Sequence, residues 1–236
     1  MNKKNNPLLQ LFTNLGMKKI YSYVLLILLC MPSMSANATD SIVTEYKNGE
    51  FVSQYKTQFK VSNKVIGDVT DYFMTDFHRS PSNLFNWALK GLGLEDKKNA
   101  ELIFVVKPSS YDEKTGITHG HFDILVPHFT TFKNVKVDAI VSKKTYKTGE
   151  TKLSADIIYS SLLLKNGVGS ITIIPQKDNE QLIIADVRLK FGWFFNIFIT
   201  QKRYKSIIEW RIKKFTENVK AECERRQANM IHKVKE

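Results

Sequence analysis

The chain has 236 residues, of which 43% are hydrophobic and 25% are charged, and 35 Lys and Arg stand against 23 Asp and Glu. This composition supports one ordinary domain with a buried core, and it excludes an intrinsically disordered, collagen-like or coiled-coil chain. The chain holds 2 cysteines, which excludes a scaffold built on several disulfides.

The first residues have the pattern of an export signal. A positively charged stretch that ends at Lys19 precedes an apolar run over residues 20–31, and Ala36 and Ala38 then form the small-x-small pattern that signal peptidase cleaves. The run is shorter than the roughly 20 apolar residues that cross a bilayer, which argues against a retained anchor. We therefore predict a signal peptide over residues 1–38, cleaved after Ala38, and a periplasmic or secreted protein.

Cys30 opens one alternative, a lipoprotein signal that is acylated at this cysteine. Such signals resemble a pattern with Gly, Ala or Ser before the cysteine, whereas Leu29 stands there. If Cys30 leaves with the signal, Cys223 is the single cysteine of the mature chain and has no internal disulfide partner. We interpret Cys223 as a small apolar side chain on a helix.

The charge of the mature chain is moderately positive. Removal of residues 1–38 takes away four lysines and no acid, so the net charge falls from +12 to +8. Such an excess suits nucleic acid, an anionic membrane surface or plain solubility, and export argues against nucleic acid. The densest basic group lies within residues 202–214. A solvated helix face is the first interpretation of this group, and peripheral contact with an anionic membrane surface is the second.

A polar leader, one strand and two short helices are predicted first in chain order. Residues 39–50 form the leader, which we expect to be flexible, and residues 51–61 alternate between apolar and polar side chains, as a half-buried strand does. Helical spacing then runs over residues 63–75 with Asn63 as the N-cap, and again over residues 80–91.

A period of two returns after residue 100 and continues to about residue 191, broken by clusters of turn residues. Six strands are predicted there, over residues 101–110, 117–126, 135–145, 151–163, 168–174 and 181–191. The strongest turn signal is Asn166 with Gly167, because both residues tolerate the positive φ of a tight hairpin. Short turns join antiparallel neighbours, so we expect an antiparallel meander.

The last segment is predicted to be a long amphipathic helix. No Pro or Gly interrupts residues 200–227, where apolar side chains recur every three or four positions among lysines. This helix is long enough to cover the apolar face of the sheet, and we expect residues 228–236 to fray. We therefore predict a single α+β domain over residues 51–227. It has a seven-stranded antiparallel sheet, two short helices after the first strand and one long C-terminal helix packed across the sheet.

This order of elements resembles the helix-grip fold of the START-like or Bet v 1-like superfamily (SRPBCC), which includes lipid-transfer domains, plant allergens and polyketide cyclase-like bacterial proteins. The resemblance spans nearly all of residues 51–227 and is topological, since the sequence matches the motif of no member family. In such folds a curved sheet grips the long helix and leaves an apolar cavity between them. The resemblance therefore implies binding of a hydrophobic small molecule such as a lipid, a sterol-like compound or an aromatic metabolite.

The candidate ligand-binding residues are inward positions of the predicted strands and the junction between the last strand and the long helix. They are Phe122, Ile124, Ile157, Tyr159, Val187, Leu189 and Trp193. The junction, residues 191–198, holds five aromatic residues, which is more than one packing face buries. Core packing, the lining or mouth of a cavity, and contact with a membrane or a partner all stay open for it.

His119, His121 and Asp123 occupy alternate positions on one predicted strand, and their residue types suit Zn²⁺. Residues two apart on a strand lie about 7 Å apart, which is a stretched bite for one metal. Their neighbours Phe122 and Ile124 have the character of a core face. We therefore predict polar residues on the outer face and no metal site, with a pH-responsive surface patch as the alternative.

Signatures of catalysis are missing from the sequence. It holds no Gly-x-Ser-x-Gly elbow, no His-Glu-x-x-His motif and no phosphate-binding loop. We predict no cofactor and favour a protein without enzymatic activity. The leading hypothesis is an exported binding protein with a cavity for a hydrophobic or amphipathic small molecule. The rivals are a cell-envelope structural or interaction protein with a solid core that works through its basic helix face, and a cyclase or isomerase that acts inside a cavity.

Overall fold

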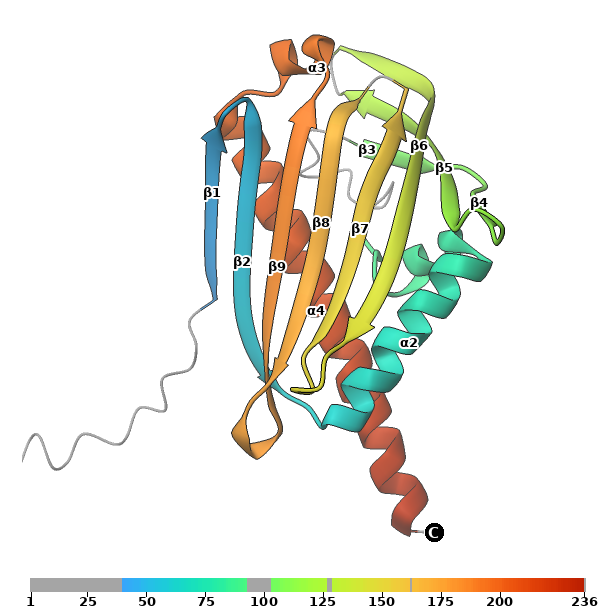
Figure 1. Cartoon of the computed structure of the whole chain (residues 1–236), viewed down its shortest axis with the longest axis vertical. Helices are drawn as coiled ribbons and strands as arrows, with labels where there is room; N and C mark the ends of the chain where they lie inside the picture. The colour runs from blue at the N-terminus through green and yellow to red at the C-terminus, as the bar shows by residue number, and fades with distance from the viewer. Residues whose placement is uncertain (1–39, 93–102, 127–128, 162, 236) are drawn as a thin grey trace, which may run out of the picture. The chain divides into compact units, whose positions relative to one another are not determined.

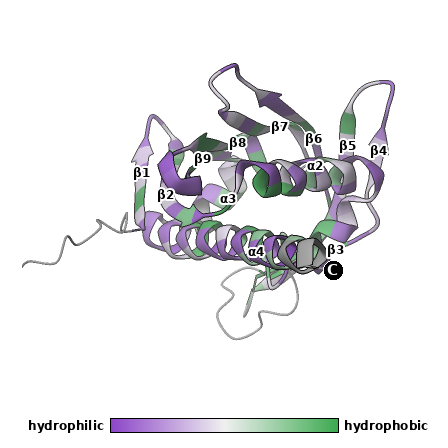
Figure 2. Ribbon diagram, turned by 90° about the horizontal axis from the view of Figure 1, so that it is seen from below, coloured by the Kyte–Doolittle hydropathy of each residue, from purple (hydrophilic) through white to green (hydrophobic). Residues whose placement is uncertain are grey.

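The structure is a computed structural model, and it describes residues 40–235 apart from 93–102, 127–128 and 162. The signal peptide predicted over residues 1–38 lies outside the described residues. Within the described part, a large antiparallel sheet carries two helices on one face, as Figure 2 shows. This is the α+β arrangement that the order of elements predicts.

The sheet has nine strands rather than seven. They are β1 (Ser41–Lys47), β2 (Glu50–Lys60), β3 (Ile103–Val106), β4 (Ser110–Asp112), β5 (Ile117–Val126), β6 (Thr130–Thr145), β7 (Thr151–Ser160), β8 (Leu164–Pro175) and β9 (Glu180–Phe191). Their order in the sheet is β1-β2-β9-β8-β7-β6-β5-β3, and β4 also pairs with β5 (Figure 1). Two differences from the prediction raise the count: β1 is new, and the strand expected over residues 101–110 is divided into β3 and β4.

Strand β1 lies in the segment that was predicted to be a flexible leader. The turn after it contains Asn48 with φ of 54° and Gly49 with φ of 78°, which are the positive angles of a tight hairpin. Residues 39–50 are therefore a correction: most of them form an edge strand paired with β2. The strand escapes prediction because an edge strand with one neighbour is mostly exposed and shows little hydrophobic alternation.

Asn166 and Gly167, predicted to form the strongest hairpin turn, lie inside β8 instead. Gly167 pairs with Leu189 of β9, and its missing side chain leaves room for Ile157. An ideal Cβ at Gly167 would lie 2.8 Å from Cδ1 of Ile157. The glycine is thus required for close side-chain packing and not for a left-handed backbone.

Helix α2 (Asn63–Arg79) follows β2 and is capped by Ser62, whose side chain accepts a hydrogen bond from the backbone N of Val65. The predicted cap, Asn63, is already the first helical residue. A short 3-10 helix, η1 (Pro81–Asn86), replaces the second predicted helix. After β9 come α3 (Trp193–Phe198) and α4 (Gln201–Lys235). Helix α4 therefore extends to Lys235, into the tail that was predicted to fray.

Both long helices lie on the same face of the sheet (Figure 2). Helix α4 contacts β1 and β2 as well as α2, and α2 contacts β4 and β6. The chain therefore has the helix-grip arrangement of START-like and Bet v 1-like proteins that its order of elements predicts, with nine strands in place of seven.

Candidate functional site

A row of small and medium side chains crosses the middle of the sheet on the helix-covered face. Val141 of β6 pairs with Ala155 of β7, Ala155 pairs with Gly169 of β8, and Gly169 pairs with Val187 of β9. Antiparallel partners lie side by side, so these four residues form one line across four strands. We call them the small-residue row. An ideal Cβ at Gly169 would meet nothing within 4 Å, so there is open space above the row.

That space is a cavity of about 250 Å³ between the small-residue row and the helices. Phe73 and Phe77 of α2 lie four residues apart and form one wall, and Ile212 and Phe215 of α4 form another. The complete set of described residues that line it is Phe73, Phe77, Leu89, Leu92, Val141, Leu153, Ser154, Ala155, Gly169, Ser170, Ile171, Ala185, Val187, Arg211, Ile212 and Phe215. The lining is almost entirely apolar. A water-sized void of about 30 Å³ adjoins it.

Hydrogen bonds fix the segment that carries Leu89 and Leu92 to the two helices. The indole Nε1 of Trp87 donates to Oδ2 of the buried Asp76 in α2 at 2.9 Å. Nδ2 of Asn218 in α4 donates to the carbonyl oxygens of Ala88 and Lys90, at 3.0 and 2.8 Å. This wall is therefore held by polar contacts behind it, and the side that faces the cavity stays apolar.

Arg211 brings a charge to the cavity, and among the described lining residues it is alone in doing so. Its Nη1 donates to the carbonyl oxygen of Leu92 at 3.2 Å, and its guanidinium carbon lies 4.7 Å from the centre of the Phe104 ring. Ser154 and Ser170 also line it, but they alternate with Ala155 and Gly169 along their strands, so their hydroxyl groups point to the other face of the sheet. The described lining thus offers a positively charged group, without a pair of titratable side chains that would act as acid and base.

Of the seven predicted ligand-binding residues, Val187 lines this cavity. Ile157 and Leu189 pair with Gly167 in the neighbouring row of the sheet, and their side chains fill the space above that glycine. Ile124 is fully buried in a solid cluster, as described below. The Phe122 ring lies over Gly120, and it makes an edge contact with Phe104.

Tyr159 and Trp193 are corrections, because both side chains are exposed, by 51% and 80%. In β7 the alternation of faces is broken by a bulge: Ala139 pairs with Ile157 but Asp138 pairs with Tyr159, so Ile158 is an extra residue. Tyr159 therefore points away from the core face that simple alternation assigns to it. Trp193 is the first residue of α3 and projects outward from it.

The aromatic walls of the cavity were missed by sequence reasoning. Phe73, Phe77 and Phe215 are spaced as core positions of their helices, and nothing in that spacing distinguishes a residue beside a void from one in a filled core. A signal did exist in the strands. Ala155 and Gly169 are paired small residues at inward positions, Ala185 of the next strand lies one row away, and small side chains side by side leave a hollow.

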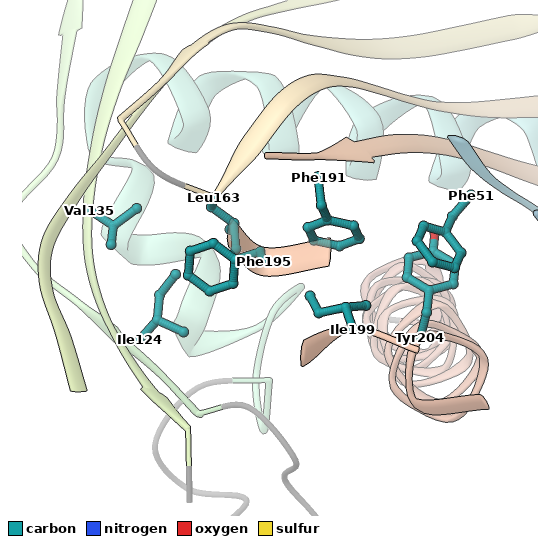
Figure 3. Close-up of a cluster of buried hydrophobic side chains, with 8 residues drawn as sticks. All are labelled: Phe51, Ile124, Val135, Leu163, Phe191, Phe195, Ile199 and Tyr204. Carbon is teal, nitrogen blue, oxygen red and sulfur yellow. The ribbon is translucent and has the colours of Figure 1, made fainter. Parts of the chain in front are cut away.

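One end of the space between sheet and helices is filled instead of hollow. We call this group the aromatic cluster, and Figure 3 shows its eight buried members: Phe51, Ile124, Val135, Leu163, Phe191, Phe195, Ile199 and Tyr204. Phe195 of α3 lies in its middle, and the rings of Phe51 and Tyr204 stack with centres 4.1 Å apart. Burial raises the pKa of the Tyr204 hydroxyl. This hydroxyl therefore stays neutral and brings no charge to this end of the core.

The histidine strand has the polar character that was predicted for its outer face. Nδ1 of His119 lies 2.8 Å from Oδ1 of Asp138, and Oδ1 of Asp123 lies 2.7 Å from Nζ of Lys107. This ion pair and the backbone N of Asn134 lower the pKa of Asp123. In the described part of the chain, no group of three or more His, Cys, Asp or Glu side chains gathers in a way that would hold a metal ion.

No family model matches the sequence, and no curated protein matches it either. Among solved structures, the chain is similar to a START superfamily protein from Mycobacterium smegmatis, with 9% identity over 74% of this chain and 97% of that one and a TM-score of 0.45. It is similar to an aromatase/cyclase from a Streptomyces species, with 7% identity, 75% and 95% coverage and a TM-score of 0.43. A truncated norcoclaurine synthase from Thalictrum flavum gives 13% identity, 72% and 92% coverage and a TM-score of 0.39.

No helix in the part of the chain that the structure describes is both long enough and apolar enough to span a membrane.

The START-like, helix-grip fold of this chain rests on the arrangement of its own strands and helices.

Proposed function

We propose that this chain is an exported, non-enzymatic binding protein that holds a hydrophobic or amphipathic small molecule between its sheet and its helices. The observation that carries the proposal is the cavity of about 250 Å³ with its almost wholly apolar lining. An envelope interaction protein with a solid core was the rival from another class, and the cavity favours binding over that rival.

The size of the cavity limits the ligand. An apolar cavity of roughly 150 Å³ holds benzene, and ligand pockets of typical enzymes and carriers begin at roughly 300 Å³. A cavity of about 250 Å³ therefore fits a compound of one or two rings, or a segment of an acyl chain. Burial of the ligand's apolar surface, at about 25 cal/mol per Å², would drive binding.

Arg211 gives the ligand an orientation. An amphipathic molecule with an anionic or carbonyl group would place this group beside the guanidinium and its apolar body against Phe73 and Phe215. We expect an aliphatic or aromatic acid to bind more tightly than the matching hydrocarbon. Comparison of the two dissociation constants at equal chain length measures the contribution of Arg211.

Export is the second part of the proposal. It rests on the charged stretch, apolar run and small-x-small pattern of residues 18–38. N-terminal sequencing of the protein recovered outside the cytoplasm of an expressing bacterium tests it. A mature chain that begins at Thr39 is the expected result, and a chain that keeps the apolar run would contradict cleavage.

The ligand is sought by native mass spectrometry of gently purified protein, followed by organic extraction. A co-purifying lipid or aromatic metabolite is expected, and its mass names the chemical class. If the protein has the mass of the bare chain and takes up nothing from a lipid mixture, binding is wrong. A bound compound that is converted during incubation would instead support the cavity-type cyclase or isomerase.

A matched pair of glycine variants connects uptake to this cavity. Gly169→Leu places an isobutyl group in the open space above the small-residue row, whereas Gly67→Leu adds the same group to α2, where an ideal Cβ also meets nothing within 4 Å. With phenylnaphthylamine as a fluorescent apolar probe, we expect Gly169→Leu to weaken binding roughly tenfold or more. Gly67→Leu should leave it unchanged. Equal affinity of both variants would place the probe elsewhere.

A further inference from the structure

The end of the sheet that carries α3 exposes large aromatic side chains. Trp193 is 80% exposed and Phe129, in the turn before β6, is 55% exposed. Figure 1 places α3 at this end, where β9 stops and β6 begins, and the contact between Phe132 and Phe195, with ring centres 4.9 Å apart, joins β6 to α3. We call this surface the aromatic end. Exposed Trp and Phe side chains at one place mark a contact surface rather than a solvated one.

The aromatic side chains sit on a rigid base. Phe195, two residues after Trp193, is buried in the middle of the aromatic cluster (Figure 3). The backbone N of Gly192 donates to the carbonyl oxygen of Leu163, which ties the start of α3 to the turn before β8. Trp193 is therefore presented by a fixed element, so little further conformational entropy is lost when it inserts into a binding surface.

Lysines surround the aromatic end. Lys136 of β6 exchanges hydrogen bonds with Ser161, close to the Leu163 that binds α3. Lys165 is the second residue of β8, beside the end of β9. Lys202 and Lys205, in the first turns of α4, share a polar groove with Lys47 at the end of β1. All five are exposed, and the acidic residues described at this end include Glu45, Glu50, the Asp123 that pairs with Lys107 and the Glu209 that pairs with Lys205.

We propose that the aromatic end docks on an anionic phospholipid bilayer. Trp prefers the boundary between headgroups and acyl chains, because its ring is apolar and its indole N–H donates to water or lipid oxygen. Each lysine near an anionic bilayer adds electrostatic attraction, and one apolar anchor plus a basic patch is the combination that gives stable peripheral binding. This docking does not depend on what the cavity holds.

Charge decides between a bilayer and a second copy of the chain. In a symmetric dimer through the aromatic end, the lysines of one copy would face those of the other, and this repulsion opposes association. An anionic bilayer is complementary to the same lysines. The occupant that fits both the aromatic side chains and the positive charge is therefore the lipid surface.

Vesicle flotation of the purified mature chain, residues 39–236, tests the proposal without the apolar run of the predicted signal peptide. We expect the protein to float with vesicles of phosphatidylglycerol and phosphatidylcholine, and to stay behind with vesicles of phosphatidylcholine alone. High salt should weaken the binding, because screening removes the attraction of the lysines. Absence of binding to the anionic vesicles would overturn the proposal.

Aromatic variants locate the contact. Trp193→Ala and Phe129→Ala together should weaken binding to anionic vesicles roughly tenfold or more, through the lost apolar burial. The control is Tyr146→Ala, which removes an exposed aromatic ring in the turn after β6, at the opposite end of that strand. Circular dichroism should show folded protein for all variants, since the replaced side chains are exposed. Equal loss in the control would mean that the aromatic end is not the contact.

Lysine variants separate a directed contact from general electrostatic attraction. Lys202→Gln with Lys205→Gln should weaken binding by about fivefold for each lysine. Lys147→Gln with Lys177→Gln removes the same charge from turns at the other end of the sheet and should change binding far less. Equal effects of both pairs would mean that net charge alone explains the binding, and docking by this end would be overturned. A dimer that sediments in solution and is lost in Trp193→Ala would assign the surface to a second copy instead.

Discussion

Two neighbouring regions between the sheet and α4 are filled in opposite ways. At one end Phe51, Phe195 and Tyr204 are buried in the aromatic cluster, and one or two strand rows further along, Ala155 and Gly169 face a cavity of about 250 Å³. The sheet and α4 contribute to both regions, while Phe195 of α3 fills the first and Phe73 and Phe77 of α2 form a wall of the second. The difference therefore comes from side-chain volume and from the covering element, and the cavity is a local departure from the close packing of protein interiors.

Gly167 and Gly169 bring this contrast down to two positions on one strand. At Gly167 an ideal Cβ would lie 2.8 Å from Ile157 and 3.2 Å from Leu189, whereas at Gly169 it would meet nothing within 4 Å. One glycine makes room for its neighbours' side chains, and the other leaves room that no side chain takes. Because strand β8 places both on the helix-covered face, the boundary between filled core and cavity runs between them.

The largest effect is expected in the filled region. Phe195→Ala should lower the free energy of unfolding by about 3–5 kcal/mol, because it removes a fully buried ring from the centre of a packed cluster. Urea unfolding followed by circular dichroism measures it. Phe129→Ala, at a side chain that is mostly exposed, is the control and should change stability by less than about 0.5 kcal/mol. Similar values for the two would show that α3 does not close the core.

The glycine pair tests the boundary itself. Gly167→Val should cost about 1–3 kcal/mol by overpacking against Ile157 and Leu189. Gly169→Val should be neutral or stabilise the protein by up to about 1 kcal/mol, since the backbone needs no positive φ and the new side chain enters open space. Urea unfolding of both variants gives the comparison. If Gly169→Val is the more costly change, the cavity is not open above the small-residue row.

The cavity wall is expected to be sensitive to a lost hydrogen bond. Trp87→Phe keeps an aromatic ring beside Tyr72 and Phe73 but removes the donor to the buried carboxylate of Asp76. We expect a loss of about 1–2 kcal/mol, because a buried acceptor is left without its partner. Thermal unfolding, with Trp210→Phe on α4 as the matched control, checks this. An unchanged midpoint would mean that the wall is held by packing alone.

The sequence was sufficient to predict the order of elements and the helix-grip arrangement, because amphipathic periods and turn clusters are local signals. The two Asn-Gly pairs show the limit of those signals. Asn48 and Gly49 form a hairpin turn at positive φ, whereas Asn166 and Gly167 lie inside a strand. Local propensity is equal for both pairs. For the second pair, contacts of Gly167 with Ile157 and Leu189, which are distant in sequence or across the sheet, decide that it forms a strand.

The candidate site was less predictable than the fold, and Val187 is the predicted residue that lines the cavity. Alternation along β7 fails at the bulge before Tyr159, and a bulge leaves no clear trace in one sequence. The aromatic run at the end of β9 was recognised, but its members separate into a buried Phe195 and an exposed Trp193. Which face of a six-residue helix is buried depends on tertiary packing that periodicity does not contain.

The smallest expected effect concerns the other closed end, where Cys223 of α4 is fully buried against residues such as Val65 and Ile183. Burial raises the pKa of this thiol from near 9 to about 12. The folded state therefore favours the protonated thiol. Its contribution to stability is complete below about pH 9 and is lost as the pH rises toward about 12.

Urea unfolding at about pH 8 and about pH 10 should show a loss of about 1 kcal/mol in the wild-type chain from this thiol. Tyr55, whose pKa burial raises to about 12, contributes in an overlapping window. Cys223→Ala isolates the thiol, because the variant keeps Tyr55 and should lose less stability between the two pH values. An equal loss in both proteins would mean that water reaches the thiol in the folded state. The solid end would then resemble the cavity, and the contrast between closed ends and a hollow middle would fail at this end.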